Sequence, residues 1–139
     1  MARVVREAMS TEPICLTSST TLIDAAVQMR EYDIGDVLIT DQDRIYGVLT
    51  DRDIVIRALA EGRDPASTTA GEIASRQLVT VSPDDPVSRA VELMREHAVR
   101  RLPVCQDGRP VGIVSVGDLA IKQDPRSALA DISAAAANR

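Results

Sequence analysis

The whole chain repeats itself at a constant offset of 65 residues. The tripeptide Met29-Arg-Glu recurs as Met94-Arg-Glu, and the alignment runs on in both directions without a gap. The identical pairs include Glu7/Glu72, Ser10/Ser75, Ala25/Ala90, Arg44/Arg109, Gly47/Gly112, Asp53/Asp118 and Ile56/Ile121. Internal self-similarity constrains the fold before any local signal does, and this period exceeds the roughly 20–50 residues of solenoid units. It therefore predicts a duplicated small module whose two halves close one core.

One motif stands out within the repeat. Gly47-Val-Leu-Thr-Asp-Arg-Asp53 returns as Gly112-Ile-Val-Ser-Val-Gly-Asp118, with glycine, hydroxyl and carboxylate at the same offsets. Each copy ends an apolar strand-like run and begins a helix-like run. A hydroxyl at such a corner is a good helix N-cap, and the glycine lets another backbone or a ligand come close. A well-formed turn used twice explains the motif without a ligand, and a binding corner is the alternative hypothesis.

The pattern of apolar residues and turn signals predicts the same element order in both halves. Each half is expected to form β-α-β-β-α, which gives a mixed α/β (α+β) fold. In the first half, the predicted elements are a helical turn over 4–9, strands over 14–16, 36–40 and 45–49, a helix from Thr20–Thr21 to about Tyr32, and a second helix that follows the last strand and runs to about Ala60. In the second half, they are strands over 79–81, 102–105 and 111–114, and helices from Pro86 to about His97 and from Asp118 to Asp124–Pro125. The predicted division is 1–65 (first repeat with linker), 66–125 (second repeat) and 126–139 (a loosely held helical or frayed tail).

Composition and charge exclude several classes of function. Aromatic residues are limited to Tyr32 and Tyr46, so a platform that stacks nucleic-acid bases is not expected. The net charge of −5 lacks the basic footprint of a DNA-binding protein. Because no apolar run approaches membrane-spanning length and no signal peptide is recognisable, we expect a cytoplasmic protein without membrane contact. Cys15 and Cys105 show no metal-ligand spacing, so we expect two buried thiols and no metal site, with a disulfide left open.

The chain resembles a tandem pair of CBS domains, the arrangement called a Bateman module. The resemblance covers nearly all of residues 1–124 and depends on the element order, the two glycine–hydroxyl–aspartate motifs and Arg101-Leu-Pro-Val104. The first repeat departs from that last pattern, since it has Asp36-Val-Leu-Ile39 without proline. The compact format is similar to small stand-alone bacterial stress-response members. The family implies two pseudo-symmetric repeats packed sheet to sheet, and commonly a flat homodimer that pairs apolar helix faces.

The resemblance also implies a function. Such modules are regulatory and bind AMP, ADP, ATP or other adenosyl compounds in the cleft between the repeats, without a required cofactor. The motif suits that ligand chemically. A carboxylate can accept hydrogen bonds from both ribose hydroxyls, and a hydroxyl with helix-start amides can face a phosphate.

By the same resemblance the two predicted sites are unequal. The preferred site would use Ser115, Asp118, Ile113, Arg101, Arg100, Ile14 and Ile34. The second, weaker site would use Thr50, Asp53, Val48, Val79 and Val99. In the second site the positions that match the two arginines are Gly35 and Asp36, and a carboxylate there repels phosphate. Arg52 would compensate locally, and Asp51 works against it.

Plainer roles compete with each of these assignments. Asp53 and Asp118 would serve equally as helix caps, and Arg100 and Arg101 as solvated side chains or ion-pair partners of Glu96 or Asp118. His97 has no nucleophile at a recognisable spacing, so no enzyme is expected. The alternative function is a ligand-free structural or stress-response protein that acts through homodimerisation and an unknown effector. Neither the choice of adenosyl ligand nor the effector can be deduced from these residues.

Overall fold

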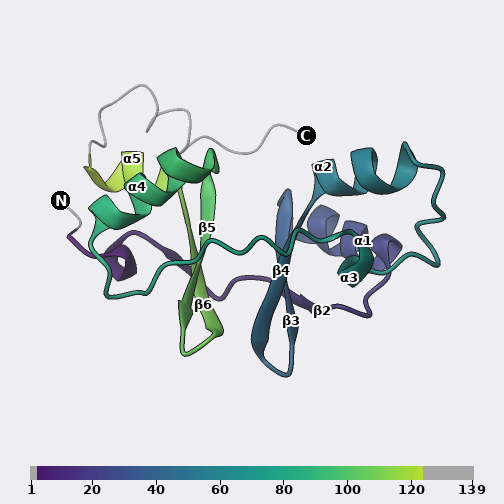
Figure 1. The fold of residues 1–139 in the computed structure, drawn as a ribbon, viewed down its shortest axis with the longest axis horizontal. Helices are drawn as coiled ribbons and strands as arrows, with labels where there is room; N and C mark the ends of the chain where they lie inside the picture. Colours follow the sequence, from purple (N-terminus) through teal and green to yellow (C-terminus); the bar gives the residue numbers. More distant parts are fainter. Residues whose placement is uncertain (1–2, 124–139) are drawn as a thin grey trace. The chain divides into compact units, whose positions relative to one another are not determined.

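The computed structural model describes residues 3–123, so the predicted tail 126–139 and the predicted helix end at Asp124–Pro125 lie outside the described residues. The chain forms two compact units (Figure 1). One unit is Ile14–Leu78, and the other joins the chain up to Pro13 to the chain from Val79 onward. The division therefore differs from the sequence repeats, because the first residues of each repeat lie with the other repeat.

The unit of Ile14–Leu78 contains a three-stranded sheet with helices around it. Its elements are β2 (Cys15–Thr17), α1 (Leu22–Tyr32), β3 (Asp36–Asp41), β4 (Arg44–Thr50), α2 (Asp51–Asp53), the π-helix η2 (Ile54–Leu59) and α3 (Ala70–Ile73). The strand order is β2-β3-β4, with β2 parallel to β3 and β4 antiparallel to it. The predicted helix cap is confirmed here, since Asp24 N donates to Thr21 Oγ1 over 3.2 Å.

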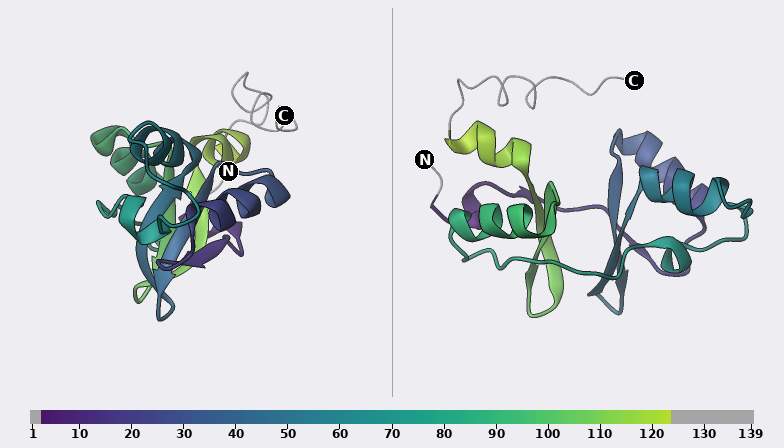
Figure 2. Two further views of the ribbon diagram at one scale, coloured as in Figure 1. Left: turned by 90° about the vertical axis from the view of Figure 1, so that its right-hand side faces the viewer. Right: turned by 45° about the horizontal axis from the view of Figure 1, so that its top comes forward.

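The second unit also contains a three-stranded sheet, but its third strand pairs with the second strand of the hairpin instead of the first. Its elements are the 3-10 turn η1 (Val5–Glu7), β1 (Ser10–Thr11), α4 (Val87–His97), β5 (Arg101–Gln106), β6 (Arg109–Ser115) and α5 (Val116–Gln123). The strand order is β1-β6-β5, and both pairings are antiparallel. In each unit the long helices lie toward the end of the hairpin opposite to its turn (Figure 2). The mixed fold of helices and two small sheets confirms the predicted α+β class.

The two hairpins share their irregularities as well as their length. The ladder shifts register between Ile39 and Thr40 in one hairpin and between Val104 and Cys105 in the other, again 65 residues apart. Both turns use left-handed backbone, at Gln42 and Asp43 in the first and at Asp107 and Gly108 in the second. The repeat predicted from sequence thus extends to the details of the backbone.

Two predicted elements differ from the structure. The strand expected over 79–81 is reduced to one bridge, in which Val81 pairs with Val104. Val81 N donates to Pro103 O and Val81 O accepts from Cys105 N, whereas residues 79 and 80 take no part in the sheet. The helix expected to run to about Ala60 is a short α-turn followed by η2, where Ala60 N donates to Val55 O over 2.9 Å. The matching segment of the second repeat, α5, is an α-helix.

The exchange of segments between repeats completes both cores. β1 pairs with β6, and Ser10 lies opposite Ile113. The equivalent contact in the other unit is the bridge between Ser75 and Val48. Val5 and Ala8 belong to the core of the unit that holds α4 and α5, whereas Ala70, Ile73 and Ala74 belong to the core that holds α1 and η2.

Each motif has a glycine at the same position, and this glycine explains how these segments come close. A Cβ atom on Gly47 would lie 2.6 Å from Ser75 O, and a Cβ atom on Gly112 would lie 2.6 Å from Ser10 O. Both distances are shorter than real Cβ contacts. The glycine of each motif therefore admits a neighbouring protein backbone, which is one of the two roles the sequence left open for it.

Candidate functional site

The second motif forms a reciprocal cap at the corner between β6 and α5. Ser115 N donates to Asp118 Oδ2 over 3.0 Å, and Asp118 N donates to Ser115 Oγ over 3.0 Å. This is the capping-box arrangement expected when a hydroxyl and an acid are three residues apart. The capping role weighed in the sequence analysis is therefore real.

The cap leaves part of the polar capacity of both side chains for a ligand. The bond to Ser115 N engages Asp118 Oδ2, whereas Oδ1 takes no part in the cap. Because Ser115 Oγ accepts a hydrogen bond in the cap, its own hydrogen can still be donated elsewhere. Both residues are partly buried rather than covered. The corner can therefore offer a negatively charged acceptor and a hydroxyl donor side by side.

The helix-start amides contribute less than the sequence suggested. Val116 N donates to Arg100 O over 2.9 Å, and the amides of Ser115 and Asp118 are engaged in the cap. Gly117 N is the remaining amide of the first turn, where intrahelical partners are lacking. A phosphate at this corner would depend on side chains more than on backbone amides.

Register places the predicted arginine beside the corner. Arg101 is the direct cross-strand partner of Ser115, and Pro103 is that of Ile113. Directly opposed residues project from the same face of a sheet, and so do residues two apart on one strand. Arg101, Ile113 and Ser115 therefore share a face. Arg100 and Arg101 are both exposed.

The first motif forms the same cap with the same distances. Thr50 N donates to Asp53 Oδ2 over 3.0 Å, and Asp53 N donates to Thr50 Oγ1 over 3.0 Å. Val48 lies two residues before Thr50 on the same face of β4. The cross-strand partner of Thr50 is Asp36, at the register position that Arg101 occupies in the other unit. The two corners therefore share a framework and differ in charge.

The structure does not bring every predicted site residue into one unit. Ile14 and Ile34 belong to the unit of Ile14–Leu78, while the Asp118 corner belongs to the other. Val79 and Val99 are likewise separated from the Asp53 corner. All four are partly buried, and their role in lining a ligand site stays a prediction.

Sequence reasoning missed one contact of a charged side chain at the first corner, that of the Asp51 carboxylate with the Gly35 backbone. A Cβ atom on Gly35 would lie 3.1 Å from Asp51 Oδ2, so the Asp51 carboxylate lies against the Gly35 backbone. Asp51 N also donates to Gly35 O over 2.9 Å. The alignment of the two repeats contained a signal for this difference. Asp51 aligns with Val116 and Gly35 aligns with Arg100, so the first corner has a carboxylate and a glycine where the second has an apolar side chain and an arginine.

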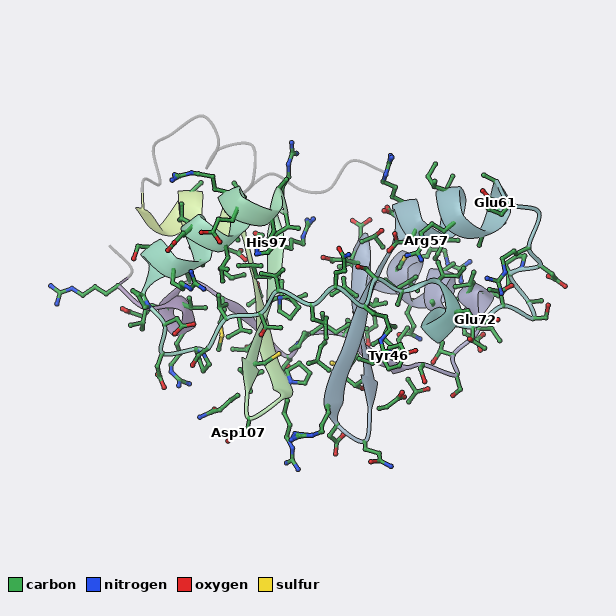
Figure 3. All side chains as sticks on the ribbon, viewed as in Figure 1. Tyr46, Arg57, Glu61, Glu72, His97 and Asp107 are labelled. Atoms are coloured by element: carbon green, nitrogen blue, oxygen red, sulfur yellow. The ribbon has the colours of Figure 1, made fainter. Side chains whose placement is uncertain are left out.

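Four further polar side chains, those of His97, Asp107, Cys15 and Cys105, lie in different parts of the fold. His97 is exposed at the C-terminal end of α4, and Asp107 lies at the tip of the β5–β6 hairpin (Figure 3). Cys15 is exposed, which corrects the expectation of a buried thiol, and Cys105 is partly buried. Although the Cys15 residue is exposed as a whole, desolvation still raises the pKa of its thiol. A raised pKa disfavours the reactive thiolate form.

Two acidic side chains with lowered pKa values lie in the segments that the repeats exchange, Glu7 in η1 and Glu72 in α3. Hydrogen bonds from the backbone of Val4 and Arg3 lower the pKa of Glu7. Hydrogen bonds from the backbone and side chain of Thr69, and then from Arg63, lower the pKa of Glu72. Both carboxylates are exposed and cap short helical turns, so their role is structural.

Neither a metal-binding cluster nor a membrane span is present in residues 3–123. No three His, Cys, Asp or Glu side chains of that range gather closely enough to hold a metal ion. Likewise, none of the helices within that range has the length and apolar character needed to cross a bilayer.

Comparison with known proteins assigns the family. The model of the CBS domain matches residues 5–59 and again residues 70–123. The chain belongs to the CBS-domain family. It is a tandem CBS module, and CBS pairs of this kind are regulatory modules.

Similar proteins extend over most of this CBS pair. Hypoxic response protein 1 of Mycobacterium tuberculosis is 45% identical over 116 residues, which is 83% of this chain and 81% of that protein. The crystal structure of Hypoxic Response Protein I with two coordinated zinc ions has a TM-score of 0.80 at 43% identity, covering 88% of this chain and 99% of that one. The CBS domain pair of protein MJ0100, in complex with 5′-methylthioadenosine and S-adenosyl-L-methionine, has a TM-score of 0.78 at 28% identity, covering 89% and 98%.

Proposed function

We propose that this CBS pair is a non-catalytic regulatory module that binds an adenine nucleotide at the Ser115–Asp118 corner. Its ligand would be AMP, ADP, ATP or a close analogue, with the Asp118 carboxylate on the ribose hydroxyls and Ser115 and Arg101 toward the phosphate. Ile113, on the same face of β6 as Ser115, would contact the adenine. No cofactor is required for this role.

The observation that carries the proposal is the register pairing of Arg101 with Ser115 beside the capped Asp118. It sets a cation and a hydroxyl donor at the end of the β5–β6 pair, beside the carboxylate acceptor at the start of α5. Guanidinium groups pair with phosphate through two parallel hydrogen bonds, and a carboxylate is the natural acceptor for a vicinal diol. The complexes of the MJ0100 CBS pair with two adenosyl compounds support the choice of ligand class.

Charge explains why this corner is preferred over the Thr50–Asp53 corner. Two unit charges about 4 Å apart interact by about 4 kcal/mol at the intermediate dielectric of a protein surface. The interaction with a phosphate is attractive at Arg101 and repulsive at Asp36 and Asp51. We therefore expect one dominant nucleotide per chain.

The test is isothermal titration with AMP and with adenosine on matched variants. Asp118→Asn keeps an oxygen for the cap but removes the charge, and it should weaken AMP binding at least about tenfold. Asp53→Asn is the control, with the same chemistry in the same cap, and should change AMP affinity less than about twofold. Arg101→Ala should weaken AMP more than adenosine. Equal losses from Asp53→Asn and Asp118→Asn would refute the assignment to one corner.

A second candidate is a ligand-free stress-response protein that acts through its surfaces and a homodimer. The name of the Mycobacterium relative, Hypoxic response protein 1, supports only the stress-response part of this candidate. Thermal melting with and without AMP, ADP and ATP separates the two, since a ligand that binds the folded state raises the melting temperature by mass action. Light scattering tests the homodimer, and a mass near that of one 15.0 kDa chain would contradict it.

A further inference from the structure

We propose that two copies of this chain swap their N-terminal arms, defined here as residues 3–11, and that Glu12 is the strained hinge that favours the swap. In its own chain the arm covers part of the unit formed with residues 79–123, which is called the acceptor surface below. In the swapped dimer the arm of a second copy covers the same surface. The inference goes beyond the proposed function, because it requires no ligand.

Polar contacts bind the arm to one side of the acceptor surface. The backbone amides of Val5 and Arg6 donate to Asp85 O and Pro83 O, each over 2.9 Å. The guanidinium group of Arg6 pairs with the carboxylate of Asp84 over 3.0 Å. The loop before α4 therefore offers a specific set of partners that any copy of the arm can use.

Apolar contacts bind the arm to the core of the same unit. Val5 and Ala8 are buried in that core, and Met9 packs against it. A Cβ atom on Gly112 would lie 2.8 Å from Met9 Sδ, so the arm lies directly on β6. Because an uncovered core exposes apolar groups to water, an arm that leaves its own chain has to be replaced. A second copy supplies the one segment that makes identical contacts.

The residue that follows the arm has an unfavourable backbone. Glu12 lies at φ 56°, in the left-handed region, and is followed by Pro13. A residue before proline favours extended backbone, and left-handed backbone strains most residues other than glycine, asparagine and aspartate. In the described chain, the other left-handed residues apart from glycine end a helix or form a hairpin turn: Asp33, Gln42, Asp43, Ala98 and Asp107. Neither motif accounts for Glu12.

Paired strands on both sides keep the hinge in this conformation. Thr11 pairs with Gly112 in one unit, and Cys15 pairs with Leu38 in the other. Residues 12 and 13 must connect these two fixed points. The matching residue of the second repeat, Gln77, is not left-handed, so its connection lacks this strain. Short connections under strain favour domain swapping, because the swap lets them extend.

A disulfide between two different chains tests the swap. Both chains carry Cys15→Ser and Cys105→Ser; one adds Ser10→Cys, and the other, of different mass, adds Ile113→Cys. These two positions lie opposite each other in the β1–β6 pair, within reach of a disulfide. Non-reducing electrophoresis of the mixture should show the mixed disulfide, with a yield that rises with protein concentration. A single chain with both new cysteines is the positive control and should form the bond within itself.

Hinge variants made in the same mixture test the role of Glu12. Glu12→Gly relieves the strain and should lower the yield of mixed disulfide at least about fivefold, since each dimer contains two hinges. Glu12→Val puts a β-branched residue at positive φ and should raise the yield by a similar factor of about five. Gln77→Gly and Gln77→Val are the matched controls and should change it less than about twofold. Circular dichroism checks that each variant is folded.

Each outcome supports or overturns the swap. Absence of the mixed disulfide at every concentration overturns it when the positive control forms its own bond. A mass of two chains without the mixed disulfide indicates a dimer through other surfaces and also overturns it. A mixed disulfide whose yield ignores both Glu12 variants refutes the strained hinge. Failure of AMP to bind leaves this inference standing, because none of these readouts depends on a nucleotide.

Discussion

The two strand-to-helix corners of this CBS pair have one backbone design and opposite electrostatic surroundings. In both, a hydroxyl and a carboxylate three residues apart cap each other over 3.0 Å. The residue opposite the hydroxyl is Asp36 in one corner and Arg101 in the other. The cap is local and depends on spacing alone, whereas the charge comes from a different strand. A duplicated motif therefore does not imply a duplicated ligand.

The segments that each repeat contributes to the core of the other repeat, η1 in one unit and α3 in the other, also differ in the size of a buried side chain. Ile73 is buried in the core of the unit that holds α1, and its counterpart 65 residues earlier is Ala8, which is buried in the other core. Each segment closes the core of the opposite repeat, but one does so with a large side chain and the other with a small one. The unit of Ile14–Leu78 should depend more strongly on its added segment.

The largest effect is expected from Ile73→Ala, which gives α3 the side chain of its counterpart. Loss of a fully buried isoleucine typically costs about 2–5 kcal/mol. Urea denaturation should show this loss of unfolding free energy, and hydrogen exchange should place it in residues 14–78. Ala8→Gly is the matched small change and should cost about 1 kcal/mol. A loss below about 0.5 kcal/mol for Ile73→Ala would contradict the role of α3 in that core.

A smaller loss is expected when the close approach at each motif glycine is blocked. Gly47→Ala and Gly112→Ala would each place a Cβ atom 2.6 Å from a backbone oxygen, so one strand must move. Overpacking of this kind typically costs about 1–3 kcal/mol. Thermal melting measures the cost, and hydrogen exchange should report it at Ser75 for the first variant and at Ser10 for the second. Reduced protection of the same segment in both variants would mean that the two contacts are not independent.

The hairpin turns offer a change that should stabilise the chain. Asp43 has a left-handed backbone with φ 62°, at the position where the other hairpin has Gly108 with φ 79°. Turns of this kind favour glycine because it has no Cβ atom to strain. Asp43→Gly should raise the unfolding free energy by about 0.5 kcal/mol, and Gly108→Asp should lower it by a similar amount. The sign of the change in melting temperature checks both variants, and two changes of the same sign would refute the comparison.

The smallest effect concerns pH. The pKa of Glu72 is lowered in the folded chain, so its contribution to stability is present above the ordinary pKa of glutamate, about 4.3, and is lost as the pH falls through the folded value. Glu72→Gln should therefore reduce stability slightly at neutral pH and flatten the acid decline. Urea denaturation between neutral pH and pH 3 measures it, with Glu7→Gln as the counterpart in the other unit. A steeper acid decline in the Gln variant would give the wrong sign.

Local spacing was enough to predict most elements and both caps. The Thr21 cap, the two hairpins, the helices α1 and α4 and the α+β class follow from apolar periodicity and turn residues, which act over a few neighbours. The predicted strand over 79–81 was wrong in its length, since Val81 alone pairs with the neighbouring strand, at Val104. The π-helical turns of η2 were also not predicted, since six residues are too few for the apolar pattern to distinguish an α-helix from a π-helix.

The amino-acid sequence by itself determined the repeat, its family and the chemistry available at each corner, because an offset of 65 residues preserves identity and spacing alike. Only the tertiary structure decided which segment closes which core and which charges meet each cap. The pairing of Ser10 with Ile113 and of Ser75 with Val48 joins residues far apart in the chain. The contact of Asp51 with Gly35 likewise depends on how β3 meets the start of α2. Such contacts depend on three-dimensional packing, which the local sequence pattern does not encode.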